Sequence, residues 1–476
     1  MKKQLFQNQN ASRRSFIKNS ALSAAAFTIV PRFVLGGNGY VAPSDTLYIA
    51  GIGVGGKGES DLTSMAKSPH AKISFLCDVD DRMAKKSIKN FPKAVYYKDF
   101  RQMLEKENKN IDAVVVSTPD HVHATAALAA MQLGKHVYVQ KPLTYSIKEA
   151  RVLAEAAKNY KVITQMGNQW ASEEPVRRIQ EVINAGLIGD VTNVYAWTDR
   201  PVWPQGIPTP TGKYEIPKEL DWDLWLGPAS KIDYNPAYLP FNWRGWWAFG
   251  TGALGDMGCH IMDPVFRALP IDYPTEVECS VTTNWSGFFQ VANYVDSCPA
   301  SSVIHLKFPR TDGKGDIKLT WMDGGLRPQT PEEVLPTDKL GDMTNGVIFE
   351  GTKGKMIGNY SEEPILLPTS RKHEINDVPK TLKRVPEGHY VDWVNACIKG
   401  HGNAEVSSPF EFAGPFTEAV LMGNLAIRSY QLQGKGNDFP GRKKLYWDAK
   451  NMKITNFDEA NAFVMREYRE GWKLLD

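Results

Sequence analysis

The chain has 476 residues, of which 42% are hydrophobic and 23% are charged. That length exceeds one ordinary domain, and the composition is typical of a soluble globular protein rather than of a disordered or fibrous chain. A net charge of +3, with no basic run interleaved with aromatic residues, argues against a nucleic-acid-binding surface.

The first 43 residues are expected to form an export signal and a spacer rather than part of the fold. Ser12-Arg13-Arg14-Ser15-Phe16-Ile17-Lys18 resembles a twin-arginine signal, and the apolar run at 21–30 is too short for a membrane span. The alternative is an ordinary helix start that contains two arginines. We therefore expect a periplasmic protein, exported in the folded state and without a membrane anchor.

A glycine-rich turn follows a predicted strand at 46–50. Gly51, Gly53 and Gly56 have the spacing G-x-G-x-x-G. In such a turn the first glycine permits the tight bend, the second lets a pyrophosphate approach the backbone, and the third lets the next helix pack closely on the strand. Phosphates would then face the free N–H groups at the start of that helix.

A second predicted strand, at 71–77, ends at Asp78, which lies 78 − 51 = 27 positions after the first glycine. An acidic side chain at this place can accept hydrogen bonds from the adenosine ribose. The alternative is a simple turn residue. Together with the glycine turn, Asp78 predicts a dinucleotide-binding unit.

Strands and helices alternate from residue 44 to residue 168. Such alternation predicts an α/β domain with a doubly wound parallel sheet, on which ligands bind beyond the carboxyl ends of the strands. Thr118, Pro119, Gln140 and Lys141 would then surround one crevice with the glycine turn. The expected strands are 111–119, 136–139 and 162–166, and the expected helices are 125–133 and 147–159.

Residues 169–476 predict a second, α+β domain with an open and mainly antiparallel sheet. Its strand-like runs follow one another without intervening helices. The stretch 199–250 is rich in proline and tryptophan, which suits carbohydrate stacking, or tryptophans that anchor a long loop. The expected strands are 191–197, 276–282, 302–308, 317–321, 347–350 and 356–360, and the expected helices are 175–185, 390–399 and 416–433.

Three residues carry the predicted chemistry. At the carboxyl end of a strand, the Lys141 ammonium can stabilise a developing alkoxide beside the cofactor. Asp256 and His260 stand at i and i+4, hence on one face of a helix if that segment is helical. Because no third ligand is evident, an acid–base pair fits them better than a metal site, and no metal is expected. The five widely spaced cysteines, without a C-x-x-C pair, also argue against zinc or a disulfide framework.

The motifs in series resemble the Gfo/Idh/MocA oxidoreductase family from residue 46 onward. Beyond the glycine turn they are Cys77-Asp78-Val79-Asp80, Ser117-Thr118-Pro119-Asp120-His121-Val122-His123, Gly134-Lys135-His136-Val137, Gln140-Lys141-Pro142 and Gly252-Ala253-Leu254-Gly255-Asp256-Met257-Gly258-Cys259-His260-Ile261-Met262-Asp263. The resemblance implies an N-terminal nucleotide domain and a C-terminal sheet that often mediates homo-oligomers.

The resemblance also implies roles for single residues. The family's matching lysine is catalytic within a Glu-Lys-Pro motif, from which this chain departs because Gln140 supplies no negative charge. The histidine matching His260 removes the hydroxyl proton, and the aspartate matching Asp256 orients substrate and base. His123 would lie near the nicotinamide. Our candidates for substrate contact are Gln169, Trp170, Arg244 and Trp247.

NAD is the expected cofactor. Asp78 would repel the 2′-phosphate of NADP, whereas Arg82 could accept it and permit NADP. The resulting hypothesis is an exported NAD(P)-dependent oxidoreductase that acts on a secondary hydroxyl or ketone of a sugar or glycoside and keeps its nucleotide tightly bound. Two alternatives stay open: an NAD-dependent enzyme that cleaves glycosides through transient oxidation and elimination, and a non-catalytic sugar-binding protein.

Overall fold

The computed structural model describes residues 45–338 and 344–474. The expected export signal, residues 1–43, lies outside the described residues. The described residues from Thr46 onward form one compact unit. Within the described part of the chain, we find no helix with the length and apolar character needed to cross a membrane.

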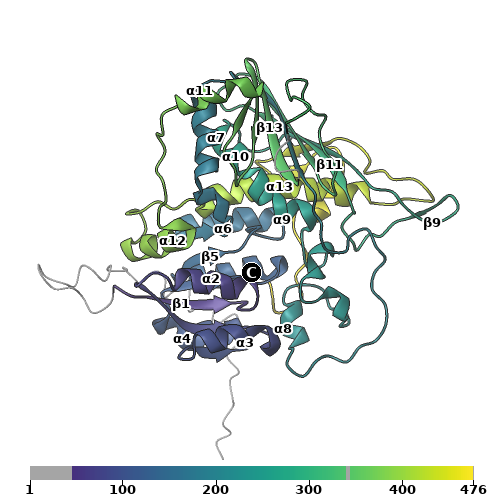
Figure 1. Ribbon diagram of the computed structural model, residues 1–476. Coiled ribbons are helices and arrows are strands. Elements are labelled where there is room, and N and C mark those ends of the chain that lie inside the picture. The colour runs from purple at the N-terminus through teal and green to yellow at the C-terminus, as the bar shows by residue number, and fades with distance from the viewer. Residues whose placement is uncertain (1–44, 339–343, 475–476) are drawn as a thin grey trace, which may run out of the picture. The chain divides into compact units, whose positions relative to one another are not determined.

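Six parallel strands form the first sheet, as expected for a doubly wound α/β fold (Figure 1). Their order is β3-β2-β1-β4-β5-β6. The strand order therefore reverses between β1 and β4, and ligands bind at such topological switch points. The strands are β1 (Leu47–Ile52), β2 (Ala71–Cys77), β3 (Val95–Tyr97), β4 (Ala113–Val116), β5 (His136–Val139) and β6 (Thr164–Met166).

Both faces of this sheet are covered, because alternate side chains of the apolar strands point to opposite sides. Ile49 and Val115 pack with α2, α3 and α12, whereas Ala50 and Val114 pack with α4, α5 and α6. The helices are α2 (Lys57–Met65), α3 (Asp81–Asn90), α4 (Phe100–Glu107), α5 (His123–Gln132), α6 (Ile147–Tyr160) and α12 (Gly388–Lys399). Helix α12 thus brings the C-terminal part of the chain onto the nucleotide sheet.

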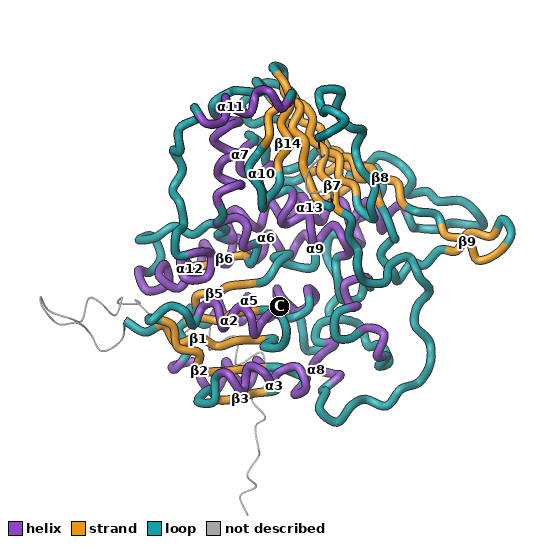
Figure 2. Tube along the Cα trace, in the orientation of Figure 1, coloured by secondary structure: helices purple, strands orange, loops and turns teal. Residues whose placement is uncertain are grey.

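The second sheet has nine strands in the order β15-β14-β13-β7-β12-β11-β8-β16-β17. All neighbours are antiparallel except β7 and β12, so the expected mainly antiparallel architecture is confirmed. Its strands are β7 (Val191–Thr198), β8 (Glu276–Val281), β11 (Ser302–Pro309), β12 (Asp316–Met322), β13 (Asn345–Gly351), β14 (Gly354–Gly358), β15 (Ile365–Leu367), β16 (Leu445–Asp448) and β17 (Lys453–Ile454). A separate hairpin, β9 (Asn284–Gly287) with β10 (Gln290–Ala292), projects from one side (Figure 2).

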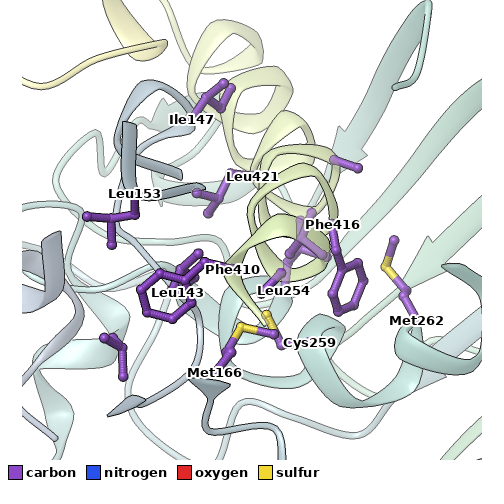
Figure 3. Close-up of a cluster of buried hydrophobic side chains, with 14 of the residues drawn as sticks. Leu143, Ile147, Leu153, Met166, Leu254, Cys259, Met262, Phe410, Phe416 and Leu421 are labelled. Atoms are coloured by element: carbon purple, nitrogen blue, oxygen red, sulfur yellow. The ribbon is translucent and has the colours of Figure 1, made fainter. Parts of the chain in front are cut away.

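Helix α13 (Phe410–Tyr430) lies between the two sheets and contacts α6, α9 and β8 (Figure 1). Figure 3 shows the buried side chains at this junction, where Phe410, Phe416 and Leu421 of α13 gather with Leu153 and Leu254. Burying such side chains stabilises the fold by about 1.5–3 kcal/mol each, so the junction is a continuous core rather than a hinge. The remaining helices are α7 (Glu174–Asn184), α8 (Trp222–Leu226), α9 (Gly252–Ile261), α10 (Asp263–Ala268) and α11 (Lys372–Asn376).

The tryptophan-rich stretch 199–250 has little regular structure but a core of its own. Trp222 and Trp225 stack with ring centroids 4.7 Å apart, and Trp246 packs with them around Phe249. These side chains are buried. They anchor the long loop, which was one of the two interpretations of their density.

Candidate functional site

A cleft of about 910 Å³ opens at the carboxyl ends of β1, β2, β4 and β5. Its volume is within the range of small-molecule and cofactor sites. The strand ends form one wall, and residues of the stretch 224–244 together with His260 form the other. The cleft therefore joins the predicted nucleotide crevice to the C-terminal half of the chain.

The glycine turn fits a dinucleotide. Gly53 has φ +75°, and a Cβ there would lie 2.8 Å from the backbone of Ser117 and Thr118, so that only glycine fits. Gly56, with φ +51°, precedes α2 and has nothing within 4 Å of its Cβ position. A phosphate can approach its backbone from that side.

The structure corrects the roles expected of two glycines. A Cβ on Gly51 would lie 2.8 Å from the Leu62 side chain of α2, so it is Gly51 that allows close packing of helix on strand. The missing side chain of Gly56 instead faces open space.

Asp78 supports the glycine turn from the end of β2. Its carboxylate accepts hydrogen bonds from the backbone N–H groups of Val54 (2.9 Å), Gly55 (3.1 Å) and Asp80 (3.0 Å). Burial raises the pKa of Asp78 to about 6, although these donors favour the ionised form. Arg82 lines the same part of the cleft, but its guanidinium is paired with Asp80 at 2.5 Å.

Lys141, which lines the cleft, pairs with Asp256 from the C-terminal half of the chain. Lys141 Nζ donates to Asp256 Oδ1 at 2.7 Å and to the Asp256 carbonyl oxygen at 3.0 Å, and Arg244 Nε lies 3.4 Å from the same Oδ1. Burial opposes ionisation of Asp256, but the charges of Lys141 and Arg244 outweigh it and hold its pKa at about 2. The site thus holds two cations around one carboxylate.

His260 lies one turn after Asp256 on α9, so the segment that carries both is helical. Burial lowers its pKa to about 3, and Lys141 lowers it further while Asp256 opposes the change, so the imidazole is neutral near pH 7. Its Nδ1 is buried without a hydrogen-bond partner among the described residues. The ring lies 5.8 Å from that of Tyr360. A neutral histidine that lines a cleft beside a lysine can accept a proton there.

Helix α9 is held against the nucleotide half by Asp120. This buried carboxylate accepts hydrogen bonds from Thr251 N (3.1 Å) and Thr251 Oγ1 (2.6 Å), just before the helix begins. Asp120 follows directly after Thr118 and Pro119, which both line the cleft as expected. The contact fixes the distance between the cofactor loop and the helix that carries Asp256 and His260.

Of the other expected cofactor residues, Gln140 lines the cleft but His123 does not. His123 is buried, with Nδ1 at 2.8 Å from the Pro142 carbonyl oxygen and Nε2 at 2.9 Å from that of Thr118. It therefore bridges the backbone at Thr118 and Pro142, and it is the first residue of α5.

The four expected substrate residues lie in different places. Gln169 and Arg244 line the cleft. Trp170 is 39% exposed and lies beside Tyr360, at 5.2 Å between ring centroids. Trp247 is not in the cleft: it is buried, its carbonyl accepts a hydrogen bond from the Tyr145 hydroxyl, and it lines a separate small pocket.

Two aromatic residues of the stretch 199–250 complete the cleft. Phe241 and Trp243 line it and enclose Arg244, whose guanidinium carbon lies 4.3 and 4.2 Å from their ring centroids. Only the density of aromatic residues around position 240 could have indicated them. Asp61, an acid on α2 that contacts Gln140, gave no sequence signal of a role in the site.

Two family models match the chain. One, described as an oxidoreductase family with an NAD-binding Rossmann fold, matches residues 47–168. The other, described as the C-terminal alpha/beta domain of an oxidoreductase family, matches residues 172–293. Together they cover the nucleotide sheet and the start of the second sheet.

Curated relatives match over a part of their length. A glycosyl hydrolase family 109 protein of Shewanella baltica (strain OS185) is 27% identical over 263 residues, which is 50% of this chain and 51% of that protein. The alpha-N-acetylgalactosaminidase of Shewanella oneidensis is 26% identical over 207 residues, which is 38% of this chain and 44% of that protein. The chain thus spans about half or less of the length of these relatives.

Solved structures share the fold at low sequence identity. The WlbA dehydrogenase of Bordetella pertussis, in complex with NADH and UDP-GlcNAcA, has a TM-score of 0.52 and 16% identity, covering 79% of this chain and 95% of that one. Levoglucosan dehydrogenase, in complex with NADH and levoglucosan, has a TM-score of 0.51 and 16% identity, covering 79% and 96%.

Proposed function

Because the chain belongs to the Gfo/Idh/MocA oxidoreductase family, we propose that it oxidises or reduces a secondary hydroxyl or ketone of a sugar or glycoside with NAD. One observation carries this proposal. Lys141 and His260 line the same cleft that begins at the glycine turn, and Asp256 pairs with Lys141. The sugar dehydrogenases among the structural neighbours support the substrate class.

The three side chains suit oxidation of an alcohol. Bound NAD supplies the hydride acceptor. The neutral His260 imidazole takes the hydroxyl proton, and the Lys141 ammonium donates a hydrogen bond to the oxygen as it becomes negative. Asp256 holds that ammonium at 2.7 Å, so the lysine needs little reorientation during the reaction. In the reverse direction, protonated His260 returns the proton to the alkoxide.

Glycoside cleavage is the second candidate. It is favoured by the similarity to glycosyl hydrolase family 109 proteins, one of them named as an alpha-N-acetylgalactosaminidase. The same Lys141 and His260 would act on a sugar whose oxidation level is unchanged at the end of the reaction, while the aglycone leaves.

One experiment separates the candidates. The protein is purified without added cofactor, bound nucleotide is identified by mass spectrometry, and reduced-nicotinamide absorbance is followed while free sugars and their aryl glycosides are added. Absorbance that rises and stays high with a free sugar supports the dehydrogenase. Aglycone release with absorbance returning to its start supports the glycosidase. If no NAD is retained and none is taken up when offered, both candidates fail.

Export is part of the proposal, since Arg13 and Arg14 match a twin-arginine signal. A folded enzyme would then carry its NAD into the periplasm, where free nucleotide is scarce. The double variant R13K/R14K is expected to stay in the cytoplasm, as measured by cell fractionation. Export of the variant at the wild-type level would contradict this route.

A homo-oligomer formed through the second sheet also stays a proposal, and it rests on the family resemblance. Its measurement is the mass in solution by light scattering. A monomer at micromolar concentration would contradict it.

A further inference from the structure

Asp61 is a buried acid on α2, the helix that follows the glycine turn, and its side chain is fully shielded from solvent. Four donors surround its carboxylate: Ser117 Oγ, Gln140 Nε2 and Tyr390 OH, each at 2.8 Å, and the ammonium of Lys57. An ionised carboxylate accepts hydrogen bonds only, so four donors satisfy it. A buried charge without such partners would be strongly unfavourable.

The donors come from four separate parts of the cleft region. Lys57 begins α2, Ser117 follows β4, Gln140 follows β5, and Tyr390 belongs to α12 of the C-terminal half. Lys57 Nζ also donates to Tyr390 OH at 2.7 Å. One carboxylate therefore ties the phosphate-facing helix to the strand end that carries the reacting lysine.

The carboxamide of Gln140 has no freedom to turn away from Asp61. A Cβ on Gly167 would lie 2.8 Å from Gln140 Cδ and Nε2, so the Gly167 backbone packs directly on the amide. The NH₂ end donates to Asp61, which leaves Oε1 toward the backbone N–H of Lys141, at 3.4 Å. The orientation of Gln140, and with it the start of the Lys141 segment, follows from the charge on Asp61.

We propose that Asp61 is a positioning residue for Lys141, and that it supplies the one negative charge that this part of the site can hold. The inference rests on the proposed function and assigns no contact between Asp61 and substrate. A glutamate at position 140 would place a second carboxylate about 2.8 Å from the first, and two carboxylates so close share a proton. The amide at position 140 therefore complements the acid at position 61, because the pair carries a single negative charge.

The test moves the charge from one position to the other. D61N removes the charge, Q140E adds a second one, and D61N/Q140E restores one acid and one amide with the positions exchanged. Readouts are kcat and KM for the sugar, NADH affinity by fluorescence, and the pH profile. D323N is the matched control, because Asp323 is a buried acid with three donor contacts, from Ser302 and Trp321, outside the cleft.

Each single cleft variant is expected to lower kcat by about tenfold to a hundredfold, as small displacements of a reacting group do. Q140E alone should lose activity as pH rises through neutrality, because the shared proton then leaves and the two charges repel. The double variant should recover most of the activity and the wild-type pH profile. D323N should change stability without changing the pH profile.

Provided that the wild-type enzyme binds NAD and turns over sugar, two results would overturn the inference. The first is a double variant no better than the worse single variant. The second is Q140E with an unchanged pH profile. Because D61N by itself could fail to fold, Q140E and the double variant decide the outcome. A wild-type protein that binds no NAD would instead overturn the proposed function, and this inference with it.

Discussion

Replacing Lys141 with methionine tests the centre of the site, since it removes the ammonium but keeps a side chain of similar length. The pKa of Asp256 lies at about 2 instead of 3.8, which corresponds to about 2 kcal/mol of net stabilisation of its carboxylate after the cost of burial. In K141M the remaining ion pair of Asp256 among the described residues is that with Arg244, at 3.4 Å. Breaking such a pair costs about 3–5 kcal/mol when fully buried, and we expect about 2–4 kcal/mol here because both side chains are about 15% exposed.

The catalytic effect of K141M should be larger than its effect on binding. Loss of a hydrogen-bond donor to a developing oxyanion lowers kcat by about 10²–10³-fold. KM for the sugar should change less, and NADH affinity should stay near the wild-type value because the glycine turn is untouched. Steady-state kinetics and fluorescence titration measure the three quantities. The control is K135M, whose lysine donates to the Asn108 carbonyl oxygen at 2.6 Å and does not line the cleft.

The stability difference between wild type and K141M should also depend on pH. Because the pKa of Asp256 is lowered in the folded protein, its contribution is present above pH 3.8 and is lost as the pH falls through about 2. Urea unfolding at pH 7 and pH 3 measures this. A K141M enzyme whose kcat stays within about threefold of wild type would refute the assignment of Lys141 to the reacting oxygen.

Three further predictions concern other parts of the molecule. G53A should lose NADH affinity and about 1–2 kcal/mol of stability or more, since its Cβ meets the Ser117 backbone, whereas G313A, with φ +76° and open space, should keep its NADH affinity in the same titration. Burial lowers the pKa of His389 to about 3, so below pH 6.5 this histidine binds a proton in the unfolded chain but stays neutral in the folded protein. Wild type should therefore lose stability as the pH falls from 7.5 to 5. H389Q should lose about 2 kcal/mol less over the same range, as measured by urea unfolding. W243A removes one of the two rings that pack on Arg244 in the cleft, so it should raise KM for the sugar more than it lowers kcat. An unchanged KM would contradict a role for Trp243 in binding the sugar.

Much of the fold follows from local sequence pattern. The apolar runs at 71–77 and 136–139 are β2 and β5 as predicted, because strands buried on both faces need continuous hydrophobic residues. Gly134 directly follows the expected helix 125–133 and has the φ of +72° that favours glycine after a helix. Asp256 and His260, spaced for one face of a helix, both lie on α9. Periodicity and glycine positions are properties of short segments, so they can be read without the tertiary structure.

Contacts between distant segments were not readable in this way. His123 of the 117–123 motif and Trp247 of the tryptophan-rich stretch do not line the cleft, because the direction of a side chain depends on how α5 and the long loop pack. Asp61 stands among ordinary helix residues, and its meeting with Gln140, 79 positions later, exists only once β5 pairs with β4 and α2 packs on the sheet. By itself, the sequence determined the parallel sheet and the glycine turn, and it proposed Lys141, Asp256 and His260 as the reacting side chains. The tertiary structure alone decided which charges surround Lys141, since a buried carboxylate can be supplied from any segment that the fold brings within hydrogen-bonding distance.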